Sequence, residues 1–190
     1  LTVLAKTGLC ALSEEQVCAL ENYAYTWSPN AAAWRTRFEK SPKGFGNAEL
    51  TDEDQKNLDR AEEARALLVT AVDELRGKVK GGNAEQISRE VYFCLKKLGA
   101  EEQQAKLVEE IRAARGIPAA EEAAREWNVV MQLLDEMAAL LGSQSVTVPE
   151  YEDLFSLLLR SSDLGHIPQT LDAVVLASAG KMRLDAPDYV

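Results

Sequence analysis

The sequence is poor in the side chains that bind metals or form disulfides. It contains one histidine and three widely spaced cysteines, Cys10, Cys18 and Cys94, with no Cys-x-x-Cys pair. A structural zinc site needs closely spaced Cys and His ligands, and a disulfide framework needs an even set of cysteines. Neither is supported, so we expect three reduced, buried thiols, as is usual for free cysteines.

Motifs of the common catalytic classes are also missing. The sequence has no Walker-type glycine-rich phosphate loop, no Gly-x-Ser-x-Gly and no cluster of His and Cys. It has no pair of carboxylates in an apolar setting that would raise the pKa of one of them. The one histidine, His166, has no candidate partner near it in the sequence, and we expect it at the surface or at a boundary. We therefore predict no catalytic residue, bound cofactor or metal in this chain.

Long apolar runs are absent as well. No stretch approaches the roughly 20 apolar residues of a membrane helix, and the first residues lack the pattern of a signal peptide. We expect a cytoplasmic setting without a membrane partner. The net charge of -10, from 31 acidic and 21 basic residues, would repel a nucleic-acid backbone, so any DNA contact must be local.

What the sequence does contain is a series of capped amphipathic segments. Ser13 with Gln16 has the pattern of a capping box, and Ser28-Pro29 has that of a cap followed by a first-turn proline. After the end of a helix at Leu1 to Thr7, closed by Gly8, we predict helices from Ser13 to about Trp27, Ser28 through Phe38, Thr51 to about Arg76, Asn83 to Leu98, Glu101 to Arg115, Pro118 to Gly142, and Thr147 to just before Ser161.

The last two of these segments carry the clearest apolar stripes. Spacings of three and four predict packing rather than a ligand site. We expect the inward residues to be Trp127, Val130, Met131, Leu134, Met137 and Leu141, followed by Tyr151, Leu154, Phe155, Leu158 and Leu159. The fold class is thus predicted as all-α, a multi-helix domain without a sheet before Ile167 and with a short strand-forming C-terminal tail.

The tail begins where a glycine and a proline break the helical pattern, around Gly165 and Pro168. A Val-rich run from Leu171 to Leu176 follows and favours a strand. Tyr189-Val190 looks like the beginning of another apolar run whose partners are not in the chain. We therefore expect the chain to be a segment of a longer protein.

One polar region interleaves aromatic with basic side chains, and we call it the basic-aromatic segment (residues 34–45). It holds Trp34, Arg35, Arg37, Phe38, Lys40, Lys43 and Phe45. Stacking and phosphate pairing on single-stranded or junction DNA use such residues, and Trp34, Arg35, Arg37 and Lys43 are the tentative contacts. In the alternative interpretation, the cations stabilise a helix dipole and Trp34 packs on Phe38.

Both ends of the chain resemble one protein family. The family's motifs are present as Gly165-x-Ile167-Pro168-x-x-Leu171-Asp172-x-Val174 with Arg183 and Tyr189-Val190, and as Lys6-Thr7-Gly8-Leu9, Ser13-Glu14-Glu15 and Leu20-Glu21-Asn22-Tyr23 with Trp27 and Trp34. In this order they resemble AddB (RexB), the B subunit of the bacterial ATP-dependent helicase/nuclease AddAB. The resemblance covers nearly the whole chain and is weakest in its middle.

The resemblance implies a domain arrangement and a function. Residues 1–165 would be a helical subdomain inserted in the second RecA-like domain of AddB, and residues 166–190 would return toward that core. The parent would process DNA double-strand breaks for recombinational repair together with AddA. Its ATP, magnesium and iron-sulfur sites would lie outside this segment, and none of the three cysteines matches a cluster ligand.

This implies an architectural, non-catalytic role, with the remainder of AddB, the AddA subunit and DNA as partners in the bacterial cytoplasm. The alternative is a freestanding helical module that binds a partner protein in a groove between helices.

Overall fold

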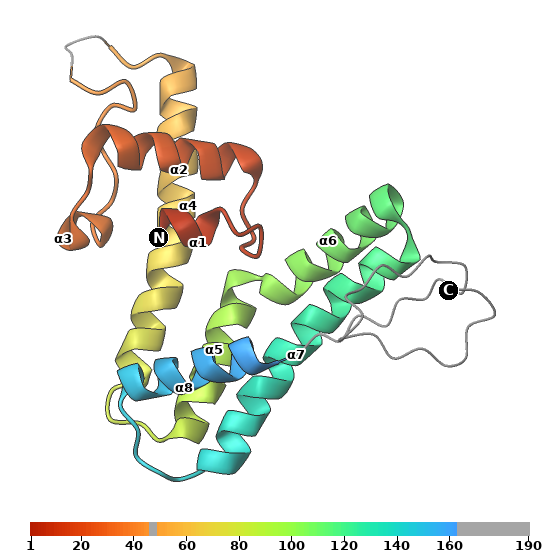
Figure 1. Cartoon of the computed structure of the whole chain (residues 1–190). Helices are drawn as coiled ribbons and strands as arrows, with labels where there is room; N and C mark the ends of the chain where they lie inside the picture. Colours follow the sequence, from red (N-terminus) through yellow and green to blue (C-terminus); the bar gives the residue numbers. More distant parts are fainter. Residues whose placement is uncertain (46–48, 163–190) are drawn as a thin grey trace, which may run out of the picture.

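The computed structural model describes residues 1–45 and 49–162, which fold into helices joined by short loops (Figure 1). The helices are α1 (Thr2–Ala5), α2 (Glu14–Trp27), α3 (Ala31–Trp34), α4 (Asp52–Lys78), α5 (Ala84–Leu98), α6 (Ala100–Arg115), α7 (Ile117–Leu141) and α8 (Val148–Ser161). These ranges contain no strand, only an isolated bridge between Asn83 and Ser145. The all-α class is confirmed. The predicted strand-forming tail and His166 lie outside the described residues.

Local capping fixes where most of these helices begin. Three helices begin with a capping box, formed by Ser13 with Gln16, Thr51 with Asp54, and Thr147 with Glu150. In each box the hydroxyl and the third residue's side chain satisfy backbone amides that the first turn leaves free. Asn83 caps α5 without a reciprocal bond from the third residue, and the Gln86 side-chain amide donates to the carbonyl of Lys78 at 3.0 Å.

The connection between α2 and α4 differs from the prediction. Ser28 does not begin a helix; it ends α2 in the left-handed conformation, with φ at 40°. Asn30 caps α3 instead, because its side-chain oxygen accepts from two free amides of the first turn. As a result α3 is a single turn, and Phe38, predicted inside a helix, lies beyond it in an irregular stretch.

The first hydrophobic core lies where α2 crosses α4 (Figure 1). The face of α4 toward this core is made mostly of small side chains, since Ala61, Ala64 and Ala71 are at most 1% exposed and flank the fully buried Leu68. Small residues let two helices approach closely. The larger buried side chains of this core are Leu20, Tyr23, Phe38, Leu58, Leu68 and Leu98.

The second core joins the end of α4 to α5, α7 and α8. Its large buried members include Ile87, Met137 and Tyr151. A buried hydrogen bond of 2.7 Å joins the hydroxyls of Ser88 on α5 and Tyr151 on α8. Burial raises the pKa of the Tyr151 hydroxyl. The polar atoms of both side chains are therefore satisfied inside the core.

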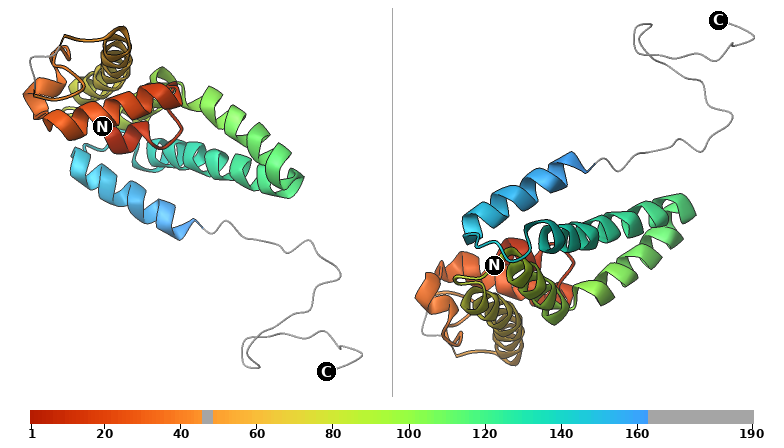
Figure 2. Two further views of the ribbon diagram at one scale, coloured as in Figure 1. Left: turned by 90° about the horizontal axis from the view of Figure 1, so that it is seen from above. Right: turned by 90° about the horizontal axis from the view of Figure 1, so that it is seen from below.

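The predicted inward face of α8 is too wide. Tyr151 is buried and Phe155 and Leu158 pack against the second core, but Leu154 and Leu159 are 38% and 39% exposed. Only one side of α8 lies against other described helices (Figure 2). A helix with neighbours on one side buries a stripe, and the two leucines lie beyond its edge.

Helix α6 and the first half of α7 form an antiparallel hairpin that extends away from the rest of the molecule, whereas the second half of α7 packs against α5 (Figures 1 and 2). Gln104 on α6 donates to the carbonyl of Ala123 on α7 at 2.8 Å. Along α7, the predicted stripe is buried at Leu134 and Met137 and half-buried at Trp127, Val130, Met131 and Leu141. No helix of the described part combines the length and apolar character needed to cross a membrane.

The cysteines differ in exposure. All three are free; Cys10 is buried, Cys94 is half-buried and Cys18 is exposed. Burial raises the pKa of the Cys10 and Cys94 thiols. The prediction of buried thiols is wrong for Cys18, because α2 packs against the rest through Ala19, Leu20 and Tyr23 and leaves this position outside.

The loop after α1 is tied to the junction of α5 and α6. The Ala11 amide donates to the carbonyl of Leu98 at 2.7 Å. Gly99 follows in the left-handed conformation with φ at 78°, and a Cβ there would lie 2.7 Å from the Cβ of Ala11. This contact distance and this backbone conformation both require glycine.

We predict that Gly99→Ala lowers the free energy of unfolding by about 3 kcal/mol, because left-handed strain adds to the clash with Ala11. Gly8→Ala is the matched control: Gly8 has φ at 74°, but nothing lies within 4 Å of its added Cβ. The free energy of unfolding should fall by only about 1 kcal/mol in this variant, from the left-handed strain alone. Urea unfolding of both variants measures the difference, and equal losses would show that the clash is absent.

Candidate nucleic-acid interface

The basic-aromatic segment is fixed to α4 by a partly buried ion pair between Glu62 and Arg65. Glu62 accepts a hydrogen bond from the Phe38 amide at 2.9 Å and one from Arg65 Nε at 2.6 Å. Arg65, 9% exposed, also donates from Nη1 to the carbonyl of Trp34 at 2.9 Å. Burial opposes ionisation of Glu62, but the hydrogen bonds from Arg65 and Phe38 together lower its pKa. The pair thus fixes the backbone at two points.

The aromatic residues of the segment are mainly packed inside. Phe38 is 3% exposed and stacks on Tyr23, with ring centroids 3.9 Å apart. Trp34 lies half-buried against the first core, and its ring is 5.5 Å from that of Phe38. The contact expected in the packing interpretation is present. It does not arise from helical spacing, because Phe38 lies beyond the end of α3.

Arg35 is engaged by a carboxylate of α4. Its Nε and Nη2 each donate to Asp73 at 2.7 Å, and its Nη1 donates to the carbonyl of Ala31 at 3.1 Å. The hydrogen bonds to Asp73 raise the pKa of Arg35, and those from Arg35 lower the pKa of Asp73. A phosphate would have to displace Asp73 to receive the same two bonds.

Lys43 pairs with the carboxylate that caps α4. Its Nζ lies 2.7 Å from Asp54 Oδ2, and the same oxygen accepts from the amide of Thr51 at 2.8 Å and from its hydroxyl at 2.6 Å. The hydrogen bond from Lys43 and those from Thr51 lower the pKa of Asp54 to about 2. Lys43 therefore links the segment to the beginning of α4.

Arg37 and Lys40 are placed differently. Arg37 is exposed and forms no hydrogen bond or salt bridge with the described residues, although the charge of Glu62 acts on it. Lys40 Nζ lies 4.5 Å from the ring centroid of Trp27, as in a cation–π contact. Phe45, 93% exposed, meets the same indole edge-on at 4.7 Å.

Of the four tentative contacts, the structure therefore holds Trp34, Arg35 and Lys43 in internal interactions and leaves Arg37 available. Sequence reasoning missed the carboxylates Asp54, Glu62 and Asp73, because nothing in the pattern separates them from the other acidic residues of α4. The DNA contact itself stays a prediction.

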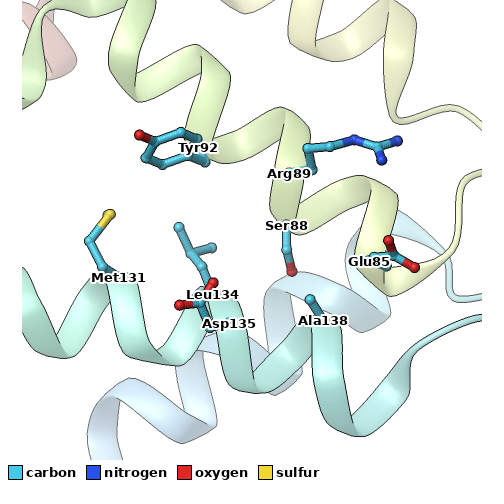
Figure 3. A pocket seen from close by; sticks show the side chains of 8 residues that line it. All are labelled: Glu85, Ser88, Arg89, Tyr92, Met131, Leu134, Asp135 and Ala138. Carbon is cyan, nitrogen blue, oxygen red and sulfur yellow. The ribbon is translucent and has the colours of Figure 1, made fainter.

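A separate hollow of about 440 Å³ lies between α5 and α7 (Figure 3). Tyr92 from α5 and Met131 and Leu134 from α7 point into it from its two sides. The Ser88 hydroxyl at its wall is hydrogen-bonded to Tyr151, and the charged side chains of Glu85, Arg89 and Asp135 also line the hollow. Within residues 1–45 and 49–162, no group of three His, Cys, Asp or Glu side chains could hold a metal ion.

We predict that Lys43→Ala raises the pKa of Asp54 from about 2 toward its ordinary value near 3.9. Lys40→Ala, which removes a neighbouring cation that does not touch Asp54, should leave it unchanged. Because the folded pKa is depressed, this carboxylate stabilises the fold above about pH 4 and stops doing so as the pH falls toward 2. Carboxyl-carbon NMR titration measures the midpoint, and the same Asp54 midpoint with and without Lys43 would contradict the pairing.

Comparison with known proteins gives one consistent result. No protein-family model matches the chain. The chain is 26% identical over 183 residues to the B subunit of the ATP-dependent helicase/deoxyribonuclease of Clostridium botulinum strain Loch Maree. It is 25% identical over 181 residues to the protein of that name in Acetivibrio thermocellus, and 27% identical over 180 residues to the one in Clostridium novyi.

These matches cover 94% of the chain but only 15% or 16% of each relative. The chain thus spans a small part of the length of the curated relatives it matches. The resemblance inferred from its terminal motifs is confirmed: over nearly its whole length, the chain is similar to one segment of the B subunit of ATP-dependent helicase/deoxyribonucleases.

Proposed function

We propose that the chain is an architectural, non-catalytic helical subdomain of the B subunit of a helicase/deoxyribonuclease. The observation that carries this proposal is the match of 94% of the chain to 16% of a relative with that name. The relatives carry the matching segment within a much longer chain, which favours a subdomain over a freestanding interaction module. The all-helical fold with two cores agrees with a scaffolding role.

In this proposal, residues 1–165 are inserted in the second RecA-like domain of the subunit, and residues 166–190 lead back toward that core. The remainder of the subunit and an AddA-type subunit are the protein partners, and DNA ends processed for recombinational repair in the bacterial cytoplasm are the substrate of the assembly. ATP, magnesium and an iron-sulfur cluster are bound elsewhere in the assembly.

The ionised side chains of the described part support this role. Carboxylates with lowered pKa values have structural partners: Asp54 and Glu150 cap helices, Glu62 holds Arg65, and Asp73 holds Arg35. A general acid or base at neutral pH needs a pKa shifted toward 7, whereas these carboxylate shifts go the other way. These groups are thus used to hold helices and loops together.

A local DNA contact through the basic-aromatic segment is a second proposal, and the exposed position of Arg37 favours it. In the chain alone the contact is expected to be weak, because a net charge of -10 opposes binding.

We predict that the purified chain neither hydrolyses ATP nor cuts DNA. Incubation with magnesium, ATP and single-stranded or duplex DNA should give no ADP or shortened strand above a blank, since the chain supplies no phosphate loop or metal-binding carboxylate set in its described part. Radiolabelled ATP and end-labelled DNA provide the readouts. Turnover that co-purifies with the chain and is abolished by a substitution within it would overturn the non-catalytic assignment.

A further inference from the structure

A hollow of about 380 Å³ lies at the junction of α2, α3 and the irregular stretch that follows α3. Its volume lies within the range of about 300–1,000 Å³ typical of small-ligand sites. The side chains that matter for its chemistry are Trp27, Ser28, Thr36, Arg37, Glu39 and Lys40. It is distinct from the hollow between α5 and α7.

The two cations of the basic-aromatic segment that are not held by carboxylates both line this hollow. Arg35 is engaged by Asp73 and Lys43 by Asp54, whereas Arg37 and Lys40 form no salt bridge with the described residues. Glu39 is the one acidic side chain in the lining. The lining therefore has a net charge of +1 on a chain of charge -10, which favours an anionic ligand at this position.

The backbone that carries Arg37 and Lys40 is held in place. The Phe38 amide donates to Glu62 at 2.9 Å, and the Lys40 amide donates to the Tyr23 hydroxyl at 3.3 Å. Phe38 itself is buried between these two points. A fixed backbone reduces the entropy lost when the two exposed side chains bind a ligand.

An aromatic ring lies beside the cations. Trp27 lines the hollow half-buried, and its Nε1 donates to the carbonyl of Ser41 at 2.9 Å, which fixes the plane of the indole. Lys40 lies over this ring and Phe45 meets it edge-on, so a base beside the indole has to displace one of these two contacts. Sites for single-stranded nucleic acid combine cations for the phosphates with an aromatic face for a base.

We propose that this hollow binds a phosphate group of single-stranded nucleic acid through Arg37 and Lys40, with the indole of Trp27 beside the adjoining base. The inference rests on the DNA contact proposed above and assigns its residues. A single strand fits better than a duplex, because a flexible strand can bring one phosphate into a recess while the acidic body keeps a rigid, highly charged duplex away.

The test is NMR of the ¹⁵N-labelled 190-residue chain, titrated with a short oligothymidine at two salt concentrations. We expect shifts of the Trp27 indole N–H and of the amides of residues 36–40. The log of the affinity should fall against log salt with a slope of about 1.4, from two contacts at about 0.7 each. Arg37→Ala with Lys40→Ala should weaken binding at least about tenfold and bring the slope close to zero.

Lys106→Ala with Arg125→Ala is the matched control. It removes the same charge from exposed positions on α6 and α7 and should change affinity less than twofold. An equal loss in both double variants would overturn the site, because net charge alone would then explain the binding.

A second titration uses inorganic phosphate at matched ionic strength. We expect phosphate to need at least about tenfold higher concentration than the oligonucleotide to shift the same signals. Saturation by phosphate without oligonucleotide binding would overturn the nucleic-acid assignment.

The NMR results also distinguish this inference from the DNA contact and the architectural role proposed above. Shifts centred on the amides around Arg35 and Lys43 instead would keep the DNA contact and overturn the hollow as its site. The absence of any shift would overturn both. Neither result bears on the architectural role, which the catalytic assays test independently.

Discussion

The long helix α4 is the element on which the rest of the structure depends, because both hydrophobic cores are built on it. Leu58 to Ala71 form its face in the first core, and Leu75 and Val79 continue into the second. The polar side of the same helix holds the basic-aromatic segment through Asp54, Glu62 and Asp73. A single helix thus fixes the two packed regions relative to each other and positions the candidate interface against them.

The acidic excess of the chain has a structural use in this arrangement. Asp54 both caps α4 and holds Lys43, and Asp73 receives two hydrogen bonds from Arg35. Ion pairs whose cation is exposed to solvent contribute little to stability individually, but they decide which cations remain available to a ligand. The segment carries four cations in sequence and presents two of them, Arg37 and Lys40, in one hollow. Counting basic residues along the sequence therefore overestimates the number of cations that are available to bind a ligand.

Local rules account for what could be predicted. Capping boxes at Ser13 and Thr147 and the left-handed Gly99 set helix ends through residues only a few positions apart, so the all-α class and most boundaries were predictable. The pairing of Arg35 with Asp73 spans 38 positions along the chain, and no periodicity indicates it. Leu154 and Leu159 were misassigned because exposure depends on which neighbours α8 has, and the cap at Asn30 was missed because the Ser28-Pro29 pattern competed with it.

The central claim is that α4 makes the helical segment one cooperative scaffold, and native-state hydrogen exchange of Leu68→Ala tests it most directly. Leu68 is fully buried in the first core and does not belong to the second. If α4 couples the cores, the slowest amides near Met137 on α7 should lose as much protection as those near Leu20 on α2, corresponding to about 3 kcal/mol. Loss of protection confined to α2 and α4, with α7 unchanged, would contradict the account.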